Sequence, residues 1–463
     1  IKLGVIRGTN VALMASDNIL DANAGSLNVT ADNLSLRADN GLIGNHDNVN
    51  GFAEENANAI DLDVAVLAAH SDSGIYLSEA DGLTVTTVAA LTVNLGSALR
   101  SNFNSTTNSV SRNKTVSSLE DLRTTTDGPI KLVSESGVLM IEGGSDAQGL
   151  SAAGSGDVLL EARGADGDLI INADVVSDTG NITLDAGNDL ALNASVTTGG
   201  LGSVYLVAVN DMTLADSVTS VSGDILVDAG LDLTQAAAIT STSGDVGLIA
   251  VGSLDQASDG DVTTGGDVLL ESGVDWMMAG DTVVTAGGNV VGQALGGDIK
   301  LGVIRGTNVA LMASDNILDA NAGSLNVTAD NLSLRADNGL IGNHDNASLT
   351  PDLNINAIDL DVAVLAAHSD SGIYLSEADG LTVTSVSEVV VDIESLVRVN
   401  FNSTTDDVSV DRNAAVLEDL RTTTDGPIKL VSESGVLTIE GGSDAQGLSA
   451  AGSGDVLLEA RGA

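Results

Sequence analysis

The stretch GDILVDAGLDLTQAAAITS, residues Gly223–Ser241, decides the fold of this chain. It holds three short apolar segments that are separated by turn-forming residues such as Gly and Asp. Related stretches recur every 21 or 22 residues, beginning at Gly180, Gly202, Gly244, Gly266 and Gly288. Three short strands per cycle, each bounded by turn formers, are typical of a three-sided parallel β-helix. Parallel crossovers are almost always right-handed, so we predict an all-β fold, a right-handed parallel β-helix.

In such coils, like residues stack on like residues at a strand spacing of about 4.8 Å. The first apolar pairs of successive coils are Ile182/Leu184, Val204/Leu206, Ile225/Val227, Val246/Leu248 and Val268/Leu270. Aliphatic and β-branched residues suit these ladders, because they fill a narrow interior without aromatic bulk. Trp276 falls in the same column as Leu190 and Met212, so we expect it to lie in the core.

A much longer repeat runs through the same chain. Residues 1–165 align without a gap onto residues 299–463, at a constant offset of 298. We therefore expect residues 1–298 to be the first long repeat unit of a continuous β-helix and residues 299–463 to be a partial second copy. The chain begins at Ile1 in the middle of this pattern, and we expect it to be an internal piece of a longer protein.

The segments that differ between the two copies are informative, because one fold must accept both versions. Residues 87–100 read TVAALTVNLGSALR, whereas residues 385–398 read SVSEVVVDIESLVR. Alternate positions stay apolar, which predicts a strand with one face buried. The coil pattern is less clear over residues 49–57, 98–120 and 396–418, where we expect loops or excursions.

Composition excludes several classes of function. The 463 residues include 65 Asp plus Glu and 17 Lys plus Arg, a formal net charge of −48, which would repel nucleic acids and anionic lipids. The chain has seven aromatic residues, too few for the core of an ordinary globular enzyme. It has no cysteine, and it has no apolar run long enough for a membrane helix. We therefore expect neither a nucleic-acid partner nor a membrane span.

The coil motif resembles that of filamentous haemagglutinin-type exoproteins. The residues that carry this resemblance are Gly180–Ala194, Gly223–Thr234 and Gly266–Met278, which follow a GD[IV]xLxAGxDLxLxA cadence. ADNGLIGN (Ala38–Asn45) and AIDLDVAVLAAHSDSGIYLSEADGLTV (Ala59–Val85) resemble giant bacterial surface adhesins of the same broad kind. The resemblance implies a bacterial secreted or surface-displayed shaft without enzymatic activity in its repeats.

Two columns of acidic residues recur with the coils and are candidate calcium sites. Their members are Asp224, Asp245 and Asp267 in one column and Asp189, Asp211 and Asp232 in the other. Calcium could bridge their oxygens and relieve the repulsion between stacked charges. The alternative, which we favour, is that these side chains close turns by bonding to their own backbone while solvent screens the charge. The sequence indicates no catalytic residue and no other cofactor.

Two non-enzymatic functions fit these patterns. The chain could be a structural filament whose partners are other copies of itself, joined end to end or laterally. It could instead be an extracellular adhesin stalk that meets a host-cell or matrix surface through loops or other domains. No Lys or Arg occurs between Arg163 and Lys300, so that acidic stretch could attract the basic residues of a neighbouring chain or could simply maintain solubility. A β-helical polysaccharide-degrading enzyme is a weaker alternative, because such sites need clustered carboxylates beside a basic residue and aromatic platforms.

Overall fold

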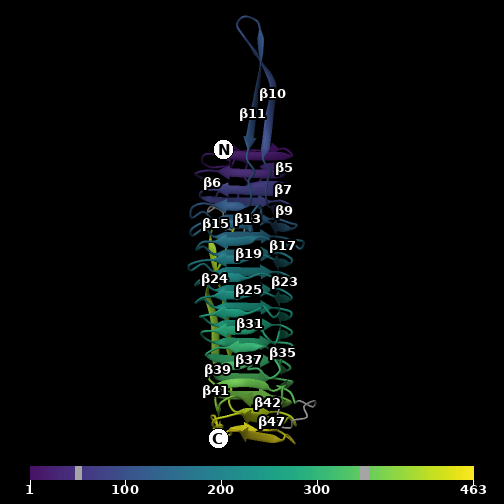
Figure 1. Ribbon diagram of the computed structural model, residues 1–463, viewed down its shortest axis with the longest axis vertical. Coiled ribbons are helices and arrows are strands. Elements are labelled where there is room, and N and C mark those ends of the chain that lie inside the picture. Colours follow the sequence, from purple (N-terminus) through teal and green to yellow (C-terminus); the bar gives the residue numbers. More distant parts are fainter. Residues whose placement is uncertain (47–54, 345–353, 463) are drawn as a thin grey trace. The chain divides into compact units, whose positions relative to one another are not determined.

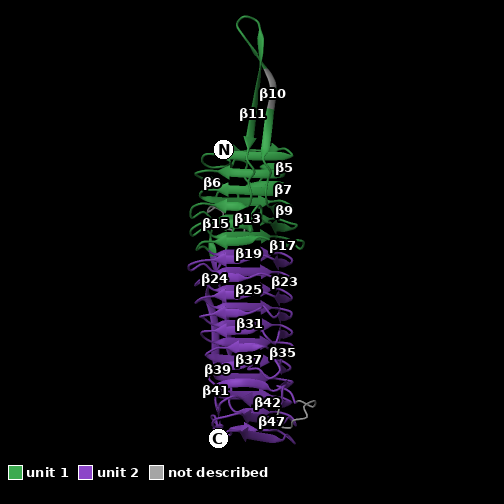
Figure 2. Cartoon of the chain, in the orientation of Figure 1, with its two compact units in different colours: residues 1–180, 399–405 green, residues 181–398, 406–463 purple. Residues whose placement is uncertain are grey.

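A computed structural model describes residues 1–46, 55–344 and 354–462 (Figure 1). The chain divides into two compact units (Figure 2). The first contains residues 1–180 and 399–405, and the second contains residues 181–398 and 406–463. Within the described ranges every regular element is a β-strand, and each unit is a stack of parallel coils. The predicted right-handed parallel β-helix is confirmed.

Each regular coil of the second unit has three strands, and each of these strands belongs to a different parallel stack. The first-strand stack consists of β19 (Ile182–Ala186), β22 (Val204–Ala208), β25 (Ile225–Ala229), β28 (Val246–Ala250), β31 (Val268–Ser272), β34 (Val290–Ala294) and β37 (Asn308–Ala313). The second-strand stack consists of β20 (Leu190–Leu192), β23 (Met212–Leu214), β26 (Leu233–Gln235), β29 (Leu254–Gln256), β32 (Trp276–Met278), β35 (Ile299–Leu301) and β38 (Ile317–Asp319). The third-strand stack consists of β21 (Val196–Thr198), β24 (Val218–Ser220), β27 (Ile239–Ser241), β30 (Val262–Thr264), β33 (Val283–Ala286) and β36 (Val303–Arg305).

Longer or more widely spaced strands continue the second unit. They are β39 (Val327–Ala336), β40 (Leu340–Ile341), β41 (Ile358–Ser369), β42 (Gly372–Glu377), β43 (Thr382–Val383), β46 (Leu420–Thr422), β47 (Ile428–Ser432), β48 (Thr438–Ile439), β49 (Leu448–Ser449) and β50 (Val456–Ala460). The strand β39 pairs with β41 along nearly its whole length. A strand such as β41 therefore completes the backbone hydrogen bonding of a strand in the preceding coil.

The first unit contains the equivalent coils of the first repeat copy. Its strands are β1 (Lys2–Leu3), β2 (Ile6–Arg7), β3 (Asn10–Ala15), β4 (Leu20–Asp21), β5 (Val29–Ala38), β6 (Leu42–Ile43), β7 (Ile60–Ser71), β8 (Gly74–Glu79), β9 (Leu83–Val85), β12 (Leu122–Thr124), β13 (Ile130–Ser134), β14 (Leu139–Ile141), β15 (Gln148–Ala152), β16 (Val158–Ala162), β17 (Leu169–Ile171) and β18 (Asp174–Ser177). The strand β13 pairs with both β8 and β16, so it lies between two coils of the stack.

Aliphatic ladders fill the interior of the coils as the sequence predicts. Val204, Ile225 and Val246 are register partners along the first-strand stack. All three side chains are fully buried. The inward residues two positions later, Leu206, Val227 and Leu248, form a second buried ladder beside the first. Burial of a side chain of this size stabilises the fold by about 1.5–3 kcal/mol, so each coil adds a comparable increment to the stack.

Each repeat copy also carries an antiparallel hairpin, which the sequence analysis described incompletely. The two hairpins are β10 (Leu91–Ser101) with β11 (Thr107–Val116) and β44 (Val389–Val399) with β45 (Thr405–Ala414). The strands predicted at residues 87–100 and 385–398 are confirmed over most of their length as β10 and β44. The predicted buried face is confirmed in β44, where Val391 and Ile393 are buried, but is wrong for β10, where Val93 is 50% exposed. Of the loops or excursions expected at residues 98–120 and 396–418, the excursions are confirmed, because most of each segment belongs to a hairpin outside the parallel coils. Of the expected loop at 49–57, residues 49–54 lie outside the described ranges.

Trp276 is fully buried, as predicted, and the space it needs comes from a glycine. Gly292 lies between Leu270 and Leu311 in the first-strand stack, at an inward position. A Cβ atom at Gly292 would lie 2.4 Å from Cζ3 of Trp276. The indole Nε1 donates a hydrogen bond to Oε1 of Gln256 at 2.8 Å, so its polar atom is satisfied inside the core.

We predict that Gly292→Ala lowers the free energy of unfolding by about 1–3 kcal/mol, because the added methyl overpacks this coil. In a Trp276→Leu background the same substitution should cost clearly less, since the clashing ring is gone. Urea unfolding of the two single variants and the double variant measures this coupling. Gly4→Ala is the matched control, because a Cβ there would meet nothing within 4 Å. Equal costs in both backgrounds would contradict the prediction.

Candidate functional site

The first predicted acidic column links each coil to the next one. Oδ1 of Asp224 accepts a hydrogen bond from the backbone N–H of Asp245 at 2.8 Å. Oδ1 of Asp245 accepts the amide of Asp267, and Oδ1 of Asp267 accepts the amide of Asn289, each at 2.7 Å. The prediction that these side chains bond to their own backbone was wrong. The donor lies one coil further along the chain.

The second column follows the same rule. Oδ1 of Asp189 accepts from the amide of Asp211 at 3.2 Å, and Oδ1 of Asp211 accepts from the amide of Asp232 at 3.1 Å. Oδ1 of Asp232 then accepts from the amide of Ser253 at 2.8 Å. In the first column, Oδ1 of the neutral Asn181 accepts the equivalent bond from the amide of Ser203 at 3.0 Å. The bond therefore needs an oxygen in this position and not a negative charge.

The charges in the first column are partly buried and repel one another. Burial, together with repulsion from the neighbouring carboxylates Asp224 and Asp267, raises the pKa of Asp245 to about 6, although its hydrogen bond from the amide of Asp267 acts to lower it. Both oxygens of Asp224 are used, since Oδ2 also accepts the amide of Ser395 in β44 at 3.2 Å. Both carboxylate oxygens of Asp224 therefore already accept a hydrogen bond, which makes Asp224 a poor ligand for a cation. Calcium binding by the columns stays a prediction.

Two acidic triads that the sequence analysis missed bring carboxylates closer together. They are Asp63, Glu79 and Asp81 in the first unit and the repeat equivalents Asp361, Glu377 and Asp379 in the second. Within each triad, one oxygen from every residue lies within 4.8 Å of the others. The signal was present in the sequence, because Glu79 and Glu377 occupy an inward position at the end of an otherwise apolar strand. Three carboxylates at this spacing could hold a divalent cation such as calcium.

The glutamate at the centre of each triad is fully buried. Both carboxyl oxygens of Glu79 lie 3.1–3.2 Å from the amide nitrogen of Val64, which donates to them. Oε1 of Glu377 accepts from the amides of Val362 and Asp379 at 3.4 Å, and its Oε2 has no hydrogen-bond partner among the described residues. Burial raises the pKa of Glu79 to about 8 and that of Glu377 to about 7. Either a proton or a cation must therefore compensate each carboxyl near neutral pH.

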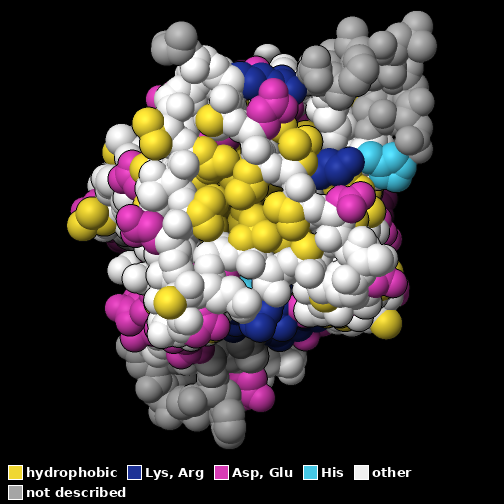
Figure 3. All heavy atoms as spheres, turned by 90° about the horizontal axis from the view of Figure 1, so that it is seen from below, with side chains coloured by type: hydrophobic (Ala, Val, Ile, Leu, Met, Phe, Trp, Pro, Cys, Tyr) yellow, Lys and Arg dark blue, Asp and Glu magenta, His cyan; other side chains and the backbone are white. Residues whose placement is uncertain are grey.

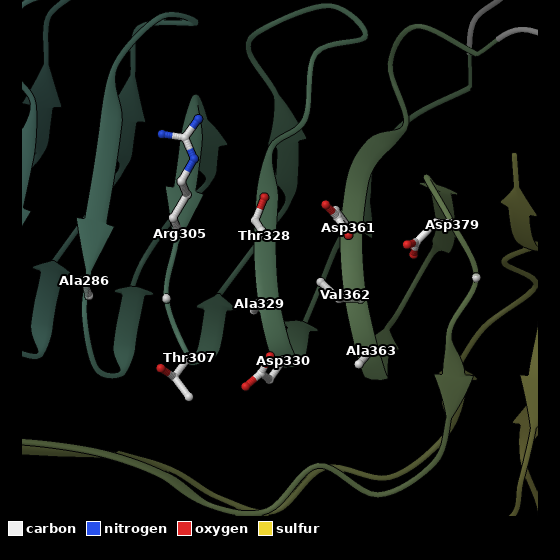
Figure 4. Close-up of a pocket in the computed structure, with 12 residues that line it drawn as sticks. Ala286, Arg305, Thr307, Thr328, Ala329, Asp330, Asp361, Val362, Ala363 and Asp379 are labelled. Carbon is white, nitrogen blue, oxygen red and sulfur yellow. The ribbon is translucent and has the colours of Figure 1, made fainter. Parts of the chain in front are cut away.

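Each triad opens onto a surface depression. The depression in the second unit has a volume of about 480 Å³, and its equivalent in the first unit has a volume of about 510 Å³. Arg305, Thr328, Asp361 and Asp379 come from successive positions across the floor (Figure 4). None of the described residues that line it is aromatic. This site combines carboxylates with an arginine, but it offers no platform on which a sugar ring could stack.

The outward side of the first-strand stack is unusually apolar, and the second hairpin covers it. We call this surface the hairpin-covered face, and its buried members are Leu226, Leu269, Val291 and Ala310. From the hairpin, Val389, Val391, Ile393, Leu396 and Ala414 pack against them. In Figure 1 the hairpin is the yellow-green ribbon that runs alongside these coils. Runs such as Ile225–Val227 were a usable signal, because three consecutive apolar residues indicate a strand buried on both faces.

Polar contacts fix the position of the hairpin on this face. Nη2 of Arg398 lies 2.9 Å from Oδ2 of Asp185. Arg412 donates to both oxygens of Glu271, at 2.5 and 3.0 Å. Burial alone would raise the pKa of Glu271, but hydrogen bonds from Arg412 and Gln293 outweigh it and lower the pKa. Two-point contacts of this kind add geometric specificity to the apolar contact.

We predict that Asp232→Ala lowers the free energy of unfolding by about 1 kcal/mol, because the amide of Ser253 loses its acceptor. Asp232→Asn should leave the melting temperature close to that of the parent chain, since Asn181 already makes this bond with a neutral oxygen. Thermal melts of the three proteins, with and without a chelator, measure both effects. If calcium bridged the column, Asn would behave like Ala and the chelator would remove the difference from the parent chain.

The buried glutamates predict an unusual pH dependence. Their pKa values are raised above the unfolded value of 4.5, so the folded state holds more protons between about pH 4.5 and 8. Stability should therefore fall as pH rises through this window. The free energy of unfolding of the double variant Glu79→Gln and Glu377→Gln should fall less steeply with pH. At pH 8 it should exceed that of the parent chain by at least about 1 kcal/mol. Chemical unfolding between pH 4.5 and 8 measures this, with the exposed Glu440→Gln as control. A parallel pH profile for the parent and the double variant would contradict the assignment.

No helix among the described residues has both the length and the apolar character needed to cross a membrane. Comparison with models of protein families, with curated proteins and with solved structures finds no match to the chain. The function must therefore be argued from the coils, the triads and the hairpins themselves.

Proposed function

We propose that the chain is a non-enzymatic structural protein that forms a long β-helical fibre or surface shaft built from tandem repeats. In this proposal it acts outside the cell or on a bacterial cell surface, as in the filamentous haemagglutinin-like proteins that its coil motif resembles. The observation that best supports the proposal is the hairpin-covered face. There, one repeat copy supplies a hairpin that is locked along coils belonging mainly to the other copy.

The coil architecture suits a load-bearing role for a physical reason. Within a unit, each interior coil donates and accepts backbone hydrogen bonds on both sides, as β25 does with β22 and β28. Exposed strand edges are then confined to the first and last coils of a stack. Stability in such a stack accumulates from neighbour to neighbour, so the chain can lengthen by adding repeats without redesigning a core.

An adhesin stalk is the closest alternative within the same structural class. In that case ligand binding would lie in loops or in other domains, and the coils would serve as a spacer. The net charge of −48 fits both roles, because it keeps an extended protein soluble and resists nonspecific lateral association. The absence of cysteine also fits an exported chain, which then has no thiols to mispair.

One specific observation favours the enzymatic alternative. Asp361 and Asp379 approach each other in a depression that Arg305 also lines, and this depression is large enough for a sugar residue. A polysaccharide-degrading site would need these groups. The lack of an aromatic platform and the presence of the same depression in both repeat copies favour a structural role.

The proposal predicts two results with the purified chain. Electron micrographs at rising protein concentration should show elongated fibres, because a structural repeat protein is expected to assemble. Assays on a panel of neutral and acidic polysaccharides should show no product above that of the double variant Asp361→Asn and Asp63→Asn. Turnover that both substitutions abolish would overturn the structural proposal in favour of an enzyme. Dispersed single particles at every concentration would favour the adhesin stalk.

A further inference from the structure

The tip of the second hairpin is buried in a socket within the first unit. Phe401 is 2% exposed and packs, together with Val399, against four side chains of the coils. These four are Ala59, Tyr76, Val133 and Leu159. An aromatic ring enclosed by aliphatic groups and a second ring is the usual form of an energetic anchor in an interface.

Polar groups in the same socket recognise the backbone of the tip. Nζ of Lys131, a side chain that is almost fully buried, donates a hydrogen bond to the carbonyl oxygen of Asn400 at 2.5 Å. Nδ2 of Asn56 lies 3.5 Å from the carbonyl oxygen of Phe401. The socket therefore combines an apolar pocket for the ring with donors for the peptide groups on either side of it.

The second unit contains the same socket in an open state. Its repeat-equivalent residues Ala357, Tyr374, Lys429, Val431 and Leu457 line a cavity of about 410 Å³. Leu457 is 45% exposed, whereas its equivalent Leu159 is 1% exposed. Nζ of Lys429 lies 5.8 Å from the centre of the Tyr374 ring, a cation–π contact. Figure 3 shows apolar side chains gathered in a patch on one face of the second unit.

The first hairpin presents the matching tip. Phe103, the equivalent of Phe401, is fully exposed, and Val93 is 50% exposed where its equivalent Val391 is fully buried. In Figure 1 β10 and β11 project away from the coils of the first unit. Single exposed apolar residues are common, but an exposed Phe at the end of a projecting hairpin is typical of a surface that binds a partner.

The two tips are built alike, whether buried or exposed. Both read Asn-Phe-Asn-Ser-Thr-Thr, at residues 102–107 and 400–405, although the strands beside them differ in sequence. In the exposed tip, Oδ1 of Asn104 accepts from the amide of Thr106 at 3.1 Å, and the buried tip repeats this bond between Asn402 and Thr404 at 2.9 Å. Ser105 and Ser403 share the left-handed conformation, with φ of 66° and 71°. The exposed tip is thus already in its binding conformation, which lowers the entropic cost of docking.

We propose that the open cavity lined by Tyr374, Lys429 and Leu457 binds the hairpin tip of a second copy of this chain, with Phe103 as the side chain that enters it. This inference rests on the proposed structural function, because the docked tip would be the joint between copies in a fibre. Arg100 and Lys114 of the first hairpin stand at the positions of Arg398 and Arg412, the cations that pair with acidic coils in the second hairpin. Cations on the tip-bearing hairpin also reduce its repulsion from a partner of charge −48.

Within the described residues, each copy presents the exposed tip at Phe103 and the open socket around Leu457. Such an interface is heterologous, so it joins copies in an open series and not in a closed pair. Two variants separate its halves. Phe103→Ala removes the tip and leaves the socket, whereas Leu457→Asp charges the socket and leaves the tip. Both residues are exposed, and circular dichroism with thermal melting should show that both variants fold like the parent chain.

Analytical ultracentrifugation of the full chain at rising concentration tests the joint. The parent chain should form a series of oligomers, and each variant alone should remain monomeric. An equimolar mixture of the two variants should form dimers and nothing larger, because only one functional tip and one functional socket are present. Oligomers of either variant alone, or a mixture that stays monomeric while the parent chain associates, would overturn the proposal.

A peptide measurement covers the case in which the parent chain itself stays monomeric. A cyclised peptide of residues 101–107 should bind the parent chain and the Phe103→Ala variant, and Phe→Ala in the peptide should weaken binding at least about tenfold. Leu457→Asp in the chain should weaken it similarly. Failure of the peptide to bind would overturn the proposal, whatever else the cavity accepts. Fibres that persist in both variants would contradict the proposed joint but not the proposed structural function. Peptide binding without fibres would support the joint and contradict the structural function.

Discussion

The stacking of like side chains at the spacing of hydrogen-bonded strands is the constraint on which the structure depends. Once Val204, Ile225 and Val246 are register partners, every residue in a coil lies above its counterpart in the previous coil. The same position in every coil then has the same surroundings, so an unpaired charge or an oversized ring is unfavourable in each coil where it occurs. Such a residue is tolerated only where a neighbouring residue provides a partner or space for it. Gly292 shows such local relief, since the absence of its side chain admits the ring of Trp276. The acidic columns show another form, in which each carboxylate accepts the amide of the next coil.

The hairpin-covered face departs from the usual division into an apolar inside and a polar outside. Its strands bury both sides, one against the interior of the coil and one against β44 and β45. Ion pairs at Asp185 and Glu271 place cations on a strongly acidic chain at the two positions where they hold the hairpin. Because apolar packing tolerates sliding and paired charges do not, the ion pairs fix the register of the hairpin on the coils. The few basic residues of the second copy are therefore used where position matters.

The sequence predicted the coils well because their signal is local. Strand alternation and turn residues recur within about 22 residues, and this is the range over which periodicity is informative. The strands β10 and β44 were found for the same reason. The contact between Asn289 and Val390 was not predictable, because it joins residues 101 apart in the sequence, and alternation does not say which outward surfaces meet. The buried Glu377 was not predicted, because the acidic residues that recur with the coils lie at turns, whereas this glutamate is the inward end of a strand.

The acidic columns and the exposed apolar groups proposed to join copies lie in different parts of this chain. Asn181 shows that the hydrogen bonds of the columns do not require charge, so the use of Asp at most column positions has another consequence, a flank with a strong negative potential. Two such flanks repel each other, which opposes lateral contact between copies. The exposed apolar groups at Phe103 and around Leu457 lie elsewhere, at a hairpin tip and in the cavity that we propose as its binding site. A chain that repels along its flanks and attracts through one tip and one socket can grow in one direction without aggregating sideways, and this asymmetry links its composition to its proposed function.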